Sequence, residues 1–318
     1  MDNYAYLGID VGSTTAKFVI IDTNNNIRKT EYTKLHAKPV EVVLSTLAEK
    51  GILDFNIVSI GVTGSSRKLI GDLLQADIIK NEITAHTIGT VNTVRGVKTI
   101  IEIGGQDSKI IFLNNDDNNM LESFAMNKVC AAGTGSFLEW QAQRLGINLD
   151  EFNRLALKST NPVKLTGKCA VFIESSIVKA QQCGYPIEDI AMGICDALVQ
   201  NYIGELTVGK KLIGPIAFQG GVAKLECMAK SFERAINQDL IVPQNCEVIG
   251  AFGMACLAKD NIRKNRNNKN QQIVNINSRK LSYNTTVTPC SGCANHCQLQ
   301  KVEYNGKFYV CGSKCGKY

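Results

Sequence analysis

Two cysteines are each followed by small or apolar residues that begin a helical pattern. They are Cys130 in NKVCAAGTGSFLEW (127–140) and Cys169 in GKCAVFIES (167–175). Each sulfur is expected at a helix N-terminus, where unpaired N–H groups and the helix dipole stabilise a thiolate. An iron–sulfur cube requires four thiolates, so two per chain suggest a cluster shared across the axis of a homodimer. The alternative is that both cysteines are small buried residues.

A glycine-rich turn between two predicted strands is a candidate phosphate site. The segment GIDVGSTTAK (8–17) joins strands expected at 4–9 and 16–21, so its backbone N–H groups can surround a phosphate. Asp10 at the strand end is expected to hold Mg²⁺ through water, because magnesium retains much of its hydration shell. The alternative is an ordinary Gly-Ser hairpin. The residues expected to bind the nucleotide here are Gly12, Ser13, Thr14, Thr15 and Lys17.

The segment IGGQDSK (103–109) repeats this chemistry. Gly104 and Gly105 allow a phosphate to approach the backbone closely. Asp107 is expected to face the metal or the attacking water, and Gln106 to orient that water. Because phosphoryl transfer needs mainly positioning and charge neutralisation, Asp10, Gln106 and Asp107 are the candidate catalytic residues.

A third glycine turn, QGGVAK (219–224), begins a helix. Gly220, Gly221 and Val222 suit the α-phosphate or the ribose of a nucleotide, and Gly250 in the following element is expected to line the adenine. One such turn is weak evidence, but three in this order predict an ATP-binding protein.

The C-terminal tail has a composition of its own. The spacing of its cysteines would allow them to bind a structural zinc ion or a second iron–sulfur cluster. Thiolates are soft ligands that suit both, so the residue type does not show which metal is bound. A tail of thiols without metal is the alternative. The candidate ligands are Cys290, Cys293, His296, Cys297, Cys311 and Cys315. The cysteines expected in the core are Cys183, Cys195, Cys227, Cys246 and Cys256.

The composition is typical of a globular protein, with 44% hydrophobic and 20% charged residues in 318. No apolar run approaches the roughly 20 residues that span a bilayer, and the first residues do not resemble a signal peptide. We therefore expect a cytoplasmic protein whose twelve cysteines are thiols and metal ligands, which suits an oxygen-poor cell. Much of the net charge of +6 comes from residues 260–280, a basic segment without the interleaved aromatic residues of a nucleic-acid site.

The elements that position these turns form an internal repeat. Strand, glycine turn and strand follow one another at 4–21 and again at 99–113, which predicts two lobes built alike. Further strands are expected at 57–62, 213–218 and 240–242, and helices at 40–50, 81–90, 150–158, 170–182, 187–207 and 250–258. The expected domains are lobe I at 1–97 with a returning helix near 250–260, lobe II at 98–249, a basic linker at 261–280 and a Cys-rich tail at 281–318.

The motifs GIDVGSTTAK, GVTGSSR, IGGQDSK and FQGGVAK resemble those of the acetate kinase, sugar kinase, Hsp70 and actin superfamily. This resemblance implies an α/β fold of two similar lobes, the actin-like ATPase (ribonuclease H-like) fold, with a nucleotide cleft between them. With NEITAH (81–86) and the two cysteine motifs, the chain resembles the ATP-dependent activators of 2-hydroxyacyl-CoA dehydratases and the related benzoyl-CoA reductase ATPase subunits. The match covers about residues 4–260, and sugar kinases of this fold lack the paired cysteine motifs.

The resemblance implies that Cys130 and Cys169 hold one [4Fe-4S] cluster between the subunits of a homodimer, and that Gly133 belongs to the cofactor-binding residues. The implied cofactors are ATP or ADP, Mg²⁺ and that cluster. The implied activity is ATP-driven donation of single electrons, received from a ferredoxin or flavodoxin, to a dehydratase, a benzoyl-CoA reductase or a double-cubane-cluster protein. A sugar-type kinase and an actin-like filament protein are the alternatives.

Overall fold

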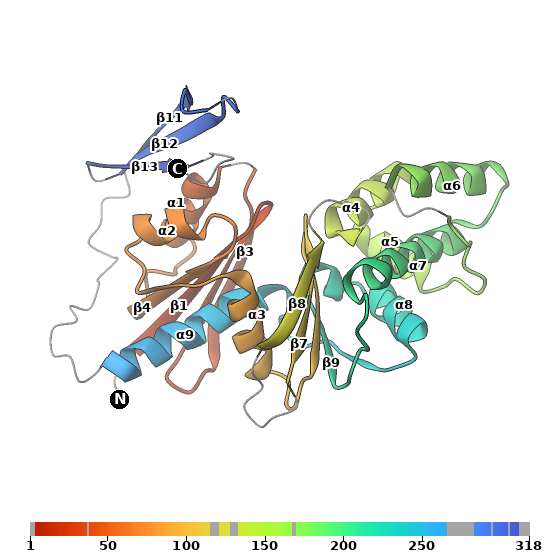
Figure 1. The fold of residues 1–318 in the computed structure, drawn as a ribbon, viewed down its shortest axis with the longest axis horizontal. Helices are drawn as coiled ribbons and strands as arrows, with labels where there is room; N and C mark the ends of the chain where they lie inside the picture. The colour runs from red at the N-terminus through yellow and green to blue at the C-terminus, as the bar shows by residue number, and fades with distance from the viewer. Residues whose placement is uncertain are drawn as a thin grey trace. The chain divides into compact units, whose positions relative to one another are not determined.

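The computed structural model describes residues 4–36, 38–114, 121–127, 133–166, 170–265, 283–293, 295–304 and 306–311 (Figure 1). The chain divides into two compact units. Unit 1 comprises Met1–Ala85 and Gly250–Tyr318, and unit 2 comprises His86–Ile249. No helix in the described part of the chain is long and apolar enough to cross a bilayer.

Unit 1 is built on a five-stranded sheet of order β3-β2-β1-β4-β5. β1 pairs antiparallel with β2 and parallel with β4, so β1 is a central strand and is buried along nearly its whole length. The strands are β1 (Tyr4–Val11), β2 (Thr15–Ile21), β3 (Ile27–Lys34), β4 (Asn56–Thr63) and β5 (Ile78–Ile79). The helices are α1 (Pro39–Glu49), α2 (Arg67–Leu73), α3 (Glu82–Val91), which continues into unit 2, and α9 (Ile249–Asn265), which begins at the last residue of unit 2.

Two glycines let α9 pack directly on this sheet. An ideal Cβ at Gly8 of β1 would lie 1.9 Å from the carbonyl oxygen of Ala251, and one at Gly61 of β4 would lie 2.5 Å from that of Met254. A side chain at either position would overlap the helix backbone. Glycine is therefore required where α9 crosses β1 and β4.

Unit 2 contains a second five-stranded sheet, of order β10-β9-β6-β7-β8. As in unit 1, the first strand of an antiparallel hairpin also pairs with a parallel strand from later in the chain: β6 pairs antiparallel with β7 and parallel with β9. This confirms the expected repeat. The strands are β6 (Thr99–Ile103), β7 (Ser108–Leu113), β8 (Leu121–Asn127), β9 (Ile216–Gln219) and β10 (Leu240–Ile241). The helices are α4 (Gly135–Arg144), α5 (Leu149–Ala156), α6 (Ala170–Gln182), α7 (Ile187–Leu206) and α8 (Glu226–Ile236), with short 3-10 helices η2 (Gly221–Lys224) and η3 (Cys246–Val248).

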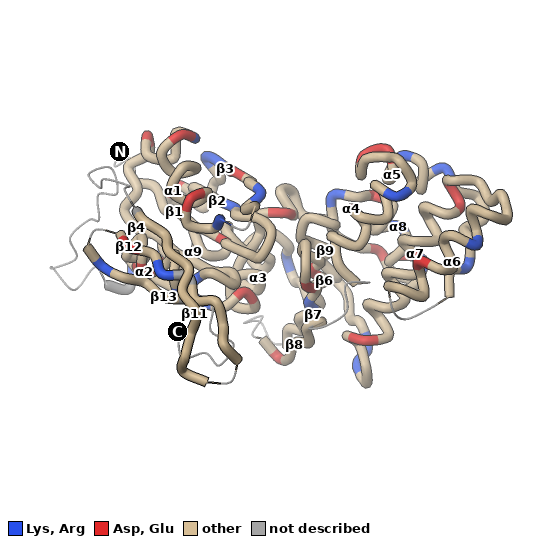
Figure 2. The backbone as a smooth tube through the Cα atoms, turned by 90° about the horizontal axis from the view of Figure 1, so that it is seen from above, with Lys and Arg blue, Asp and Glu red and all other residues tan. Residues whose placement is uncertain are grey.

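The core of unit 2 is packed by the apolar side chains of α7, α8 and the sheet. Tyr202, Phe218 and Phe232 are almost completely buried, and the Phe232 ring lies 5.2 Å from each of the other two ring centroids. In both units, acidic and basic residues are interspersed along the chain, and charges of one sign do not gather in one region (Figure 2). Among the cysteines expected in the core, Cys195, Cys227, Cys246 and Cys256 are buried. Cys183 is exposed, because it lies in the turn after α6, so that expectation was wrong.

The C-terminal segment forms a three-stranded antiparallel sheet that the sequence analysis did not predict. Its strands are β11 (Tyr283–Pro289), β12 (Gln298–Tyr304) and β13 (Lys307–Cys311). Val302 and Tyr304 of β12 are 0% and 3% exposed, and they belong to the same apolar cluster as the core of unit 1. This sheet, which we call the tail sheet, is therefore packed onto unit 1.

Candidate functional site

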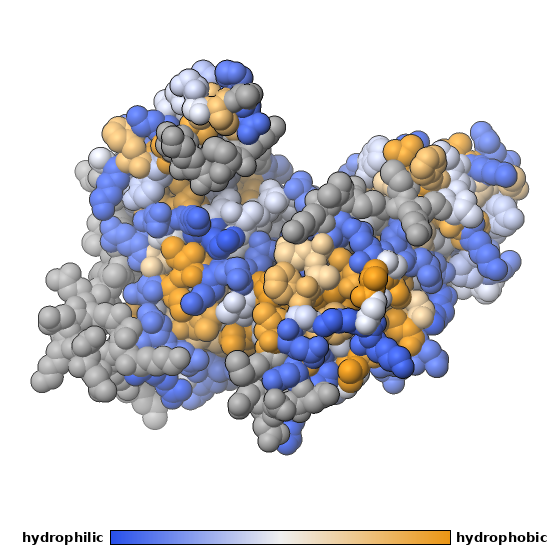
Figure 3. All heavy atoms as spheres, viewed as in Figure 1, coloured by the Kyte–Doolittle hydropathy of each residue, from blue (hydrophilic) through white to orange (hydrophobic). Residues whose placement is uncertain are grey.

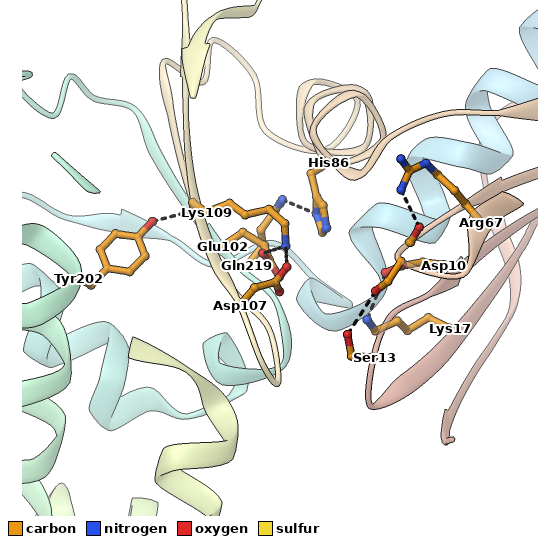
Figure 4. A network of polar contacts seen from close by, with 12 residues as sticks. Asp10, Ser13, Lys17, Arg67, His86, Glu102, Asp107, Lys109, Tyr202 and Gln219 are labelled. Carbon is orange, nitrogen blue, oxygen red and sulfur yellow. Dashed lines mark hydrogen bonds and ion pairs between the residues drawn. The ribbon is translucent and has the colours of Figure 1, made fainter. Parts of the chain in front are cut away.

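The first glycine turn of unit 1 places a buried carboxylate at the end of β1. Asp10 is 4% exposed and lies between Lys17 of β2 and Thr63 of β4 in the strand register. The Lys17 ammonium is 3.1 Å from Oδ2 of Asp10 (Figure 4). The Thr63 hydroxyl oxygen is buried and has no hydrogen-bond partner among the described residues. Carboxylate and hydroxyl oxygens of this kind suit a hydrated Mg²⁺ ion, so the residues present fit the expected metal.

The motif GVTGSSR (61–67) covers the end of β4 and the turn after it, and that turn lies beside the first glycine turn. Gly64 has a φ of +97°, and an ideal Cβ there would lie 2.2 Å from the Val11 carbonyl oxygen, so only glycine allows the two turns to approach. The hydroxyl oxygens of Ser13 and Ser65 are 3.3 Å apart, and Ser13 is exposed. Arg67 donates from Nη1 to the Gly64 carbonyl at 3.0 Å. Two short hydroxyl-bearing turns are thus held side by side in unit 1.

Backbone contacts hold the first turn in a tight shape. The N–H of Gly12 donates to the Thr15 carbonyl at 3.0 Å, and Leu35 N–H donates to the Thr14 carbonyl at 2.8 Å. Thr15 is 9% exposed, whereas Gly12 and Thr14 are half-buried. Gly250, which was expected to line the adenine, is buried at the start of α9.

The second glycine turn, in unit 2, joins β6 to β7. The N–H of Gly104 donates to the Asp107 carbonyl at 3.0 Å and closes the turn. Gln106 is exposed and Asp107 is half-buried, so both side chains reach the surface of unit 2. The Asp107 carboxylate contacts the ammonium of Lys109 at 2.9 Å (Figure 4). Lys109 was quoted in the motif but was not expected to contact Asp107.

The third turn packs against the second. Gly220 has a φ of +92°, and an ideal Cβ there would lie 2.3 Å from the Ile103 carbonyl oxygen at the end of β6. Gly221 and Val222 follow in η2, and Gly221 is half-buried. Because an ideal Cβ at Gly135 would lie 2.9 Å from the Gly104 carbonyl oxygen and 3.0 Å from Val222, unit 2 brings both turns and the start of α4 together.

The start of α4 is hydrogen-bonded to the second turn through the main chain. The N–H groups of Gly135 and Ser136 donate to the carbonyls of Gly104 and Gly105, each at 2.9 Å. We call these two bonds the turn–helix link. Gly133, which precedes them, is buried beside Asn127 at the end of β8. Cys130 comes five residues before α4 begins.

A buried polar group that the sequence analysis missed lies beside the third turn. Gln219, at the end of β9, is 0% exposed, its Nε2 lies 2.9 Å from Nδ1 of His86, and its Oε1 accepts a 2.7 Å hydrogen bond from the Thr90 hydroxyl. His86 closes the NEITAH motif on α3. In the sequence, only the NEITAH motif drew attention to His86, because its partner Gln219 lies 133 residues further along the chain.

The cluster cysteines Cys130 and Cys169 lie outside the described residues, as do Cys315 and the side chain of Cys311. Their metal binding therefore stays a prediction. Among the described side chains, no three His, Cys, Asp or Glu groups are gathered so that they would hold a metal ion.

The tail cysteines that are described lie in the turn between β11 and β12. Cys290 and Cys297 are 9% and 7% exposed and pack together with Leu299, whereas Cys293 is exposed. The N–H of Cys290 donates to the Cys297 carbonyl at 2.7 Å, and the Gly292 N–H donates to the Cys290 sulfur at 3.4 Å.

The sheets and their glycine turns define a class of protein: the chain has the actin-like ATPase fold, as expected. A solved structure of the activator of the 2-hydroxyisocaproyl-CoA dehydratase from Clostridium difficile with bound ADPNP superposes with a TM-score of 0.74 at 30% identity, covering 84% of this chain and 99% of that one. The model of the BadF/BadG/BcrA/BcrD ATPase family matches residues 7–258. The chain belongs to this family.

Curated relatives agree with this assignment. The 2-hydroxyisocaproyl-CoA dehydratase activator of Clostridioides difficile is 31% identical over 266 residues, which cover 82% of this chain and 97% of the relative. The activator of lactoyl-CoA dehydratase of Anaerotignum propionicum is 32% identical over 261 residues, covering 81% and 98%. The tail sheet lies beyond the residues that the family model matches.

Proposed function

We propose that this chain is an ATP-hydrolysing electron donor that passes single low-potential electrons to a partner iron–sulfur enzyme. The partner classes are a 2-hydroxyacyl-CoA dehydratase, a benzoyl-CoA reductase or a double-cubane-cluster protein. The observation that carries the proposal is that relatives named as dehydratase activators match this chain over nearly their whole length. The feature of this sequence that separates it from sugar-type kinases is the pair of motifs around Cys130 and Cys169.

The glycine turns would bind the phosphates of ATP and orient the attacking water. Asp10 would hold a hydrated Mg²⁺ ion, with Lys17 fixing its carboxylate. Asp107 and Gln106 at the surface of unit 2 would position the water that attacks the γ-phosphate. The backbone N–H groups of the turns would compensate the negative charge that the phosphates bring.

The cluster would be shared by two copies of the chain, each providing Cys130 and Cys169. When bound, a [4Fe-4S] cluster supplies reversible one-electron storage, which a reduced ferredoxin or flavodoxin would refill. Exposed apolar side chains close in sequence to the cysteines support an interface between two copies. Val171 and Phe172, two and three residues after Cys169, are each 65% exposed, and Trp140 of α4, ten residues after Cys130, is 49% exposed. The surface also shows apolar regions interspersed with hydrophilic ones (Figure 3).

The turn–helix link gives this proposal a path from nucleotide to cluster. Binding or hydrolysis of ATP at Gly104 and Gly105 would move the turn, and the main-chain bonds to Gly135 and Ser136 would pass that movement to α4. α4 follows Cys130 in the sequence. Nucleotide exchange would therefore bias the arrangement of the cysteines and the docking of the partner.

Anaerobic purification followed by iron, sulfide and mass analysis tests the proposal. We expect a coloured dimer in which the iron that depends on Cys130 and Cys169 amounts to about four iron and four sulfide ions per two chains, apart from any metal of the tail. Cys130→Ala and Cys169→Ala should lose the iron and the ATP-dependent reduction of a partner dehydratase. Cys183→Ala, which removes an exposed thiol of the same unit, is the matched control and should retain both. A Cys130→Ala variant that keeps its iron and still reduces the partner would contradict the proposal.

We propose that the tail binds a second metal, with Cys290, Cys293, Cys297, Cys311 and Cys315 as candidate ligands. Because the three described cysteines are not gathered in this structure, metal binding would have to bring them together. The hydrogen bond from the Gly292 N–H to the Cys290 sulfur supports this proposal, because hydrogen bonds to the sulfurs are among the contacts by which proteins tune iron–sulfur clusters. Zinc and iron measured in the same samples test it. Cys290→Ser should lose one metal ion or cluster while the iron that depends on Cys130 remains, and an unchanged metal content would exclude the tail site.

A further inference from the structure

Lys109 carries an ammonium group into the interior of unit 2. The residue is 1% exposed, and its Nζ lies 3.0 Å from Oε2 of Glu102 and 2.9 Å from Oδ2 of Asp107. Removing an ammonium from water is strongly unfavourable unless partners compensate its charge. Glu102, itself 4% exposed, is the buried partner, and Asp107 is the partner that reaches the surface (Figure 4).

The sheet fixes this arrangement. Glu102 is directly opposite Lys109 in the register of β6 and β7, and opposite Gln219 in the register of β6 and β9. From α7, the Tyr202 hydroxyl donates to the Lys109 carbonyl at 2.6 Å. Strand pairing therefore sets the distance between the lysine and the glutamate, and a helix holds the lysine backbone.

The consequence concerns Asp107. Lys109 contacts Oδ2 of its carboxylate, whereas Oδ1 lies next to Gly104, where an ideal Cβ would be only 3.1 Å away. Two carboxylates and one ammonium leave one formal negative charge in this group. Glu102 compensates the positive charge of Lys109, so Asp107 keeps a negative charge that can act on a cation. The contact with the buried Lys109 ammonium fixes the orientation of the Asp107 carboxylate.

We infer that Glu102 and Lys109 are positioning residues for Asp107 in ATP hydrolysis. The inference rests on the proposed function, since it assumes that Asp107 acts on the metal-bound nucleotide or the attacking water. Lys109 holds one carboxylate oxygen in place, and Glu102 prevents the lysine from neutralising Asp107. Neither residue needs to touch the nucleotide.

Two variants separate charge from orientation. Glu102→Gln keeps a hydrogen-bonding side chain but leaves Lys109 paired with Asp107 alone, so the group becomes formally neutral. The double variant E102Q/K109M removes both buried charges and keeps the formal charge on Asp107, but it removes the contact that orients it. The double variant also avoids an unpaired buried charge, so it is expected to fold.

The measurements are ATP hydrolysis by the full-length dimer without any partner, ATP binding by calorimetry, and the Mg²⁺ concentration that gives half-maximal hydrolysis. We expect kcat to fall roughly 10- to 100-fold in both variants, because misplacing a reacting group by about 1 Å has effects of this size. ATP affinity should change less than threefold. Glu102→Gln should in addition need more Mg²⁺, which a purely structural role would not cause.

Glu226→Gln/Lys230→Met provides the matched control, since it removes an exposed Lys–Glu pair of the same unit, 2.8 Å apart on α8. This control should hydrolyse ATP at the wild-type rate. A folded E102Q/K109M variant with wild-type kcat would overturn the inference. A wild-type protein that does not hydrolyse ATP would instead overturn the proposed function, so the two failures can be told apart.

Discussion

Side chains with the same chemistry have very different surroundings in this protein. The side chains of Lys109 and Glu102 are 2% and 5% exposed, whereas those of Lys230 and Glu226 are 52% and 60% exposed. Water screens the exposed pair, which contributes little to stability. Loss of one member of the buried pair would leave an uncompensated charge in the interior. The sequence alone does not separate these two pairs, because each consists of a lysine and a glutamate and only the fold shows which pair is buried.

Burial of a thiol on α9 predicts a pH dependence of stability. Desolvation raises the pKa of Cys256 to about 12, so the folded state keeps this proton at a pH where the unfolded chain loses it. The stabilising effect is complete below about pH 8.5, the pKa of an ordinary thiol, and is lost as the pH rises towards about 12. Chemical denaturation between pH 8 and pH 11 should show unfolding free energy that falls by at most about 1.4 kcal/mol per pH unit from this group.

The Cys256→Ala variant should show a shallower decrease over the same pH range. Cys183→Ala is the control, because it makes the same substitution at a thiol that is exposed in the folded protein. An identical slope in the wild type and in Cys256→Ala would show that other groups cause the alkaline loss of stability.

The places of Asp10 and Asp107 in the fold could be predicted, because each lies in or next to a glycine turn between two apolar strands. Their roles in the site stay a prediction. Glu102 could have been paired with Lys109 from the hairpin register, but its burial depends on α7 and β9 from later in the chain. The contact of His86 with Gln219 joins residues 133 positions apart and could not be predicted by local spacing.

At the level of elements, the close packing of α9 on β1 predicts an intolerant glycine. Gly8→Ala would place a methyl group 1.9 Å from the Ala251 carbonyl oxygen and 2.4 Å from the Ala255 nitrogen. Because both atoms belong to the backbone, either the helix or the strand must move. We expect the unfolding free energy to decrease by about 3 kcal/mol, measured by urea denaturation.

Gly204 of α7 provides the contrasting substitution. Its ideal Cβ has no neighbour within 4 Å, and the residue lies inside a helix. Gly204→Ala should therefore stabilise the protein by about 0.5–1 kcal/mol through helix propensity. If both glycine variants changed stability equally, packing of α9 would not be the reason for glycine at position 8.

Many elements with an apolar pattern were predicted, but the short helix α2 was missed although its apolar side chains are buried. β6 and α6 have the predicted bounds, because β6 is mostly apolar and the apolar residues of α6 recur at helical spacing. β3 (IRKTEYTK) and β8 (LESFAMN) are more exposed strands at the edges of their sheets, so neither has a continuous apolar run. α9 ends at Asn265 and thus extends into the segment that was predicted as a linker.

At the level of the whole molecule, the tail sheet is part of unit 1 rather than a separate appendage. This predicts that its inner face contributes to stability. Val302→Ala removes two methyl groups from a side chain that is 0% exposed, and it should lower the unfolding free energy by about 2 kcal/mol. Thermal and urea unfolding would measure this loss.

Val287→Ala on β11 is the matched control, because that valine is 64% exposed in the same sheet. It should change stability by less than about 0.5 kcal/mol. Equal effects of the two substitutions would mean that the tail sheet does not pack on unit 1 in solution. The strands of the tail sheet were not predicted, because the expectations for this segment depended on its cysteines alone.

The turn–helix link consists of amide and carbonyl groups only, and every amino acid except proline carries the amide. Homologues can therefore diverge at the side chains of both segments and still keep the connection. Proline at position 136 would delete one donor without adding charge or much bulk. Under the proposed function, Ser136→Pro should therefore still hydrolyse ATP but transfer fewer electrons to its partner for each ATP hydrolysed.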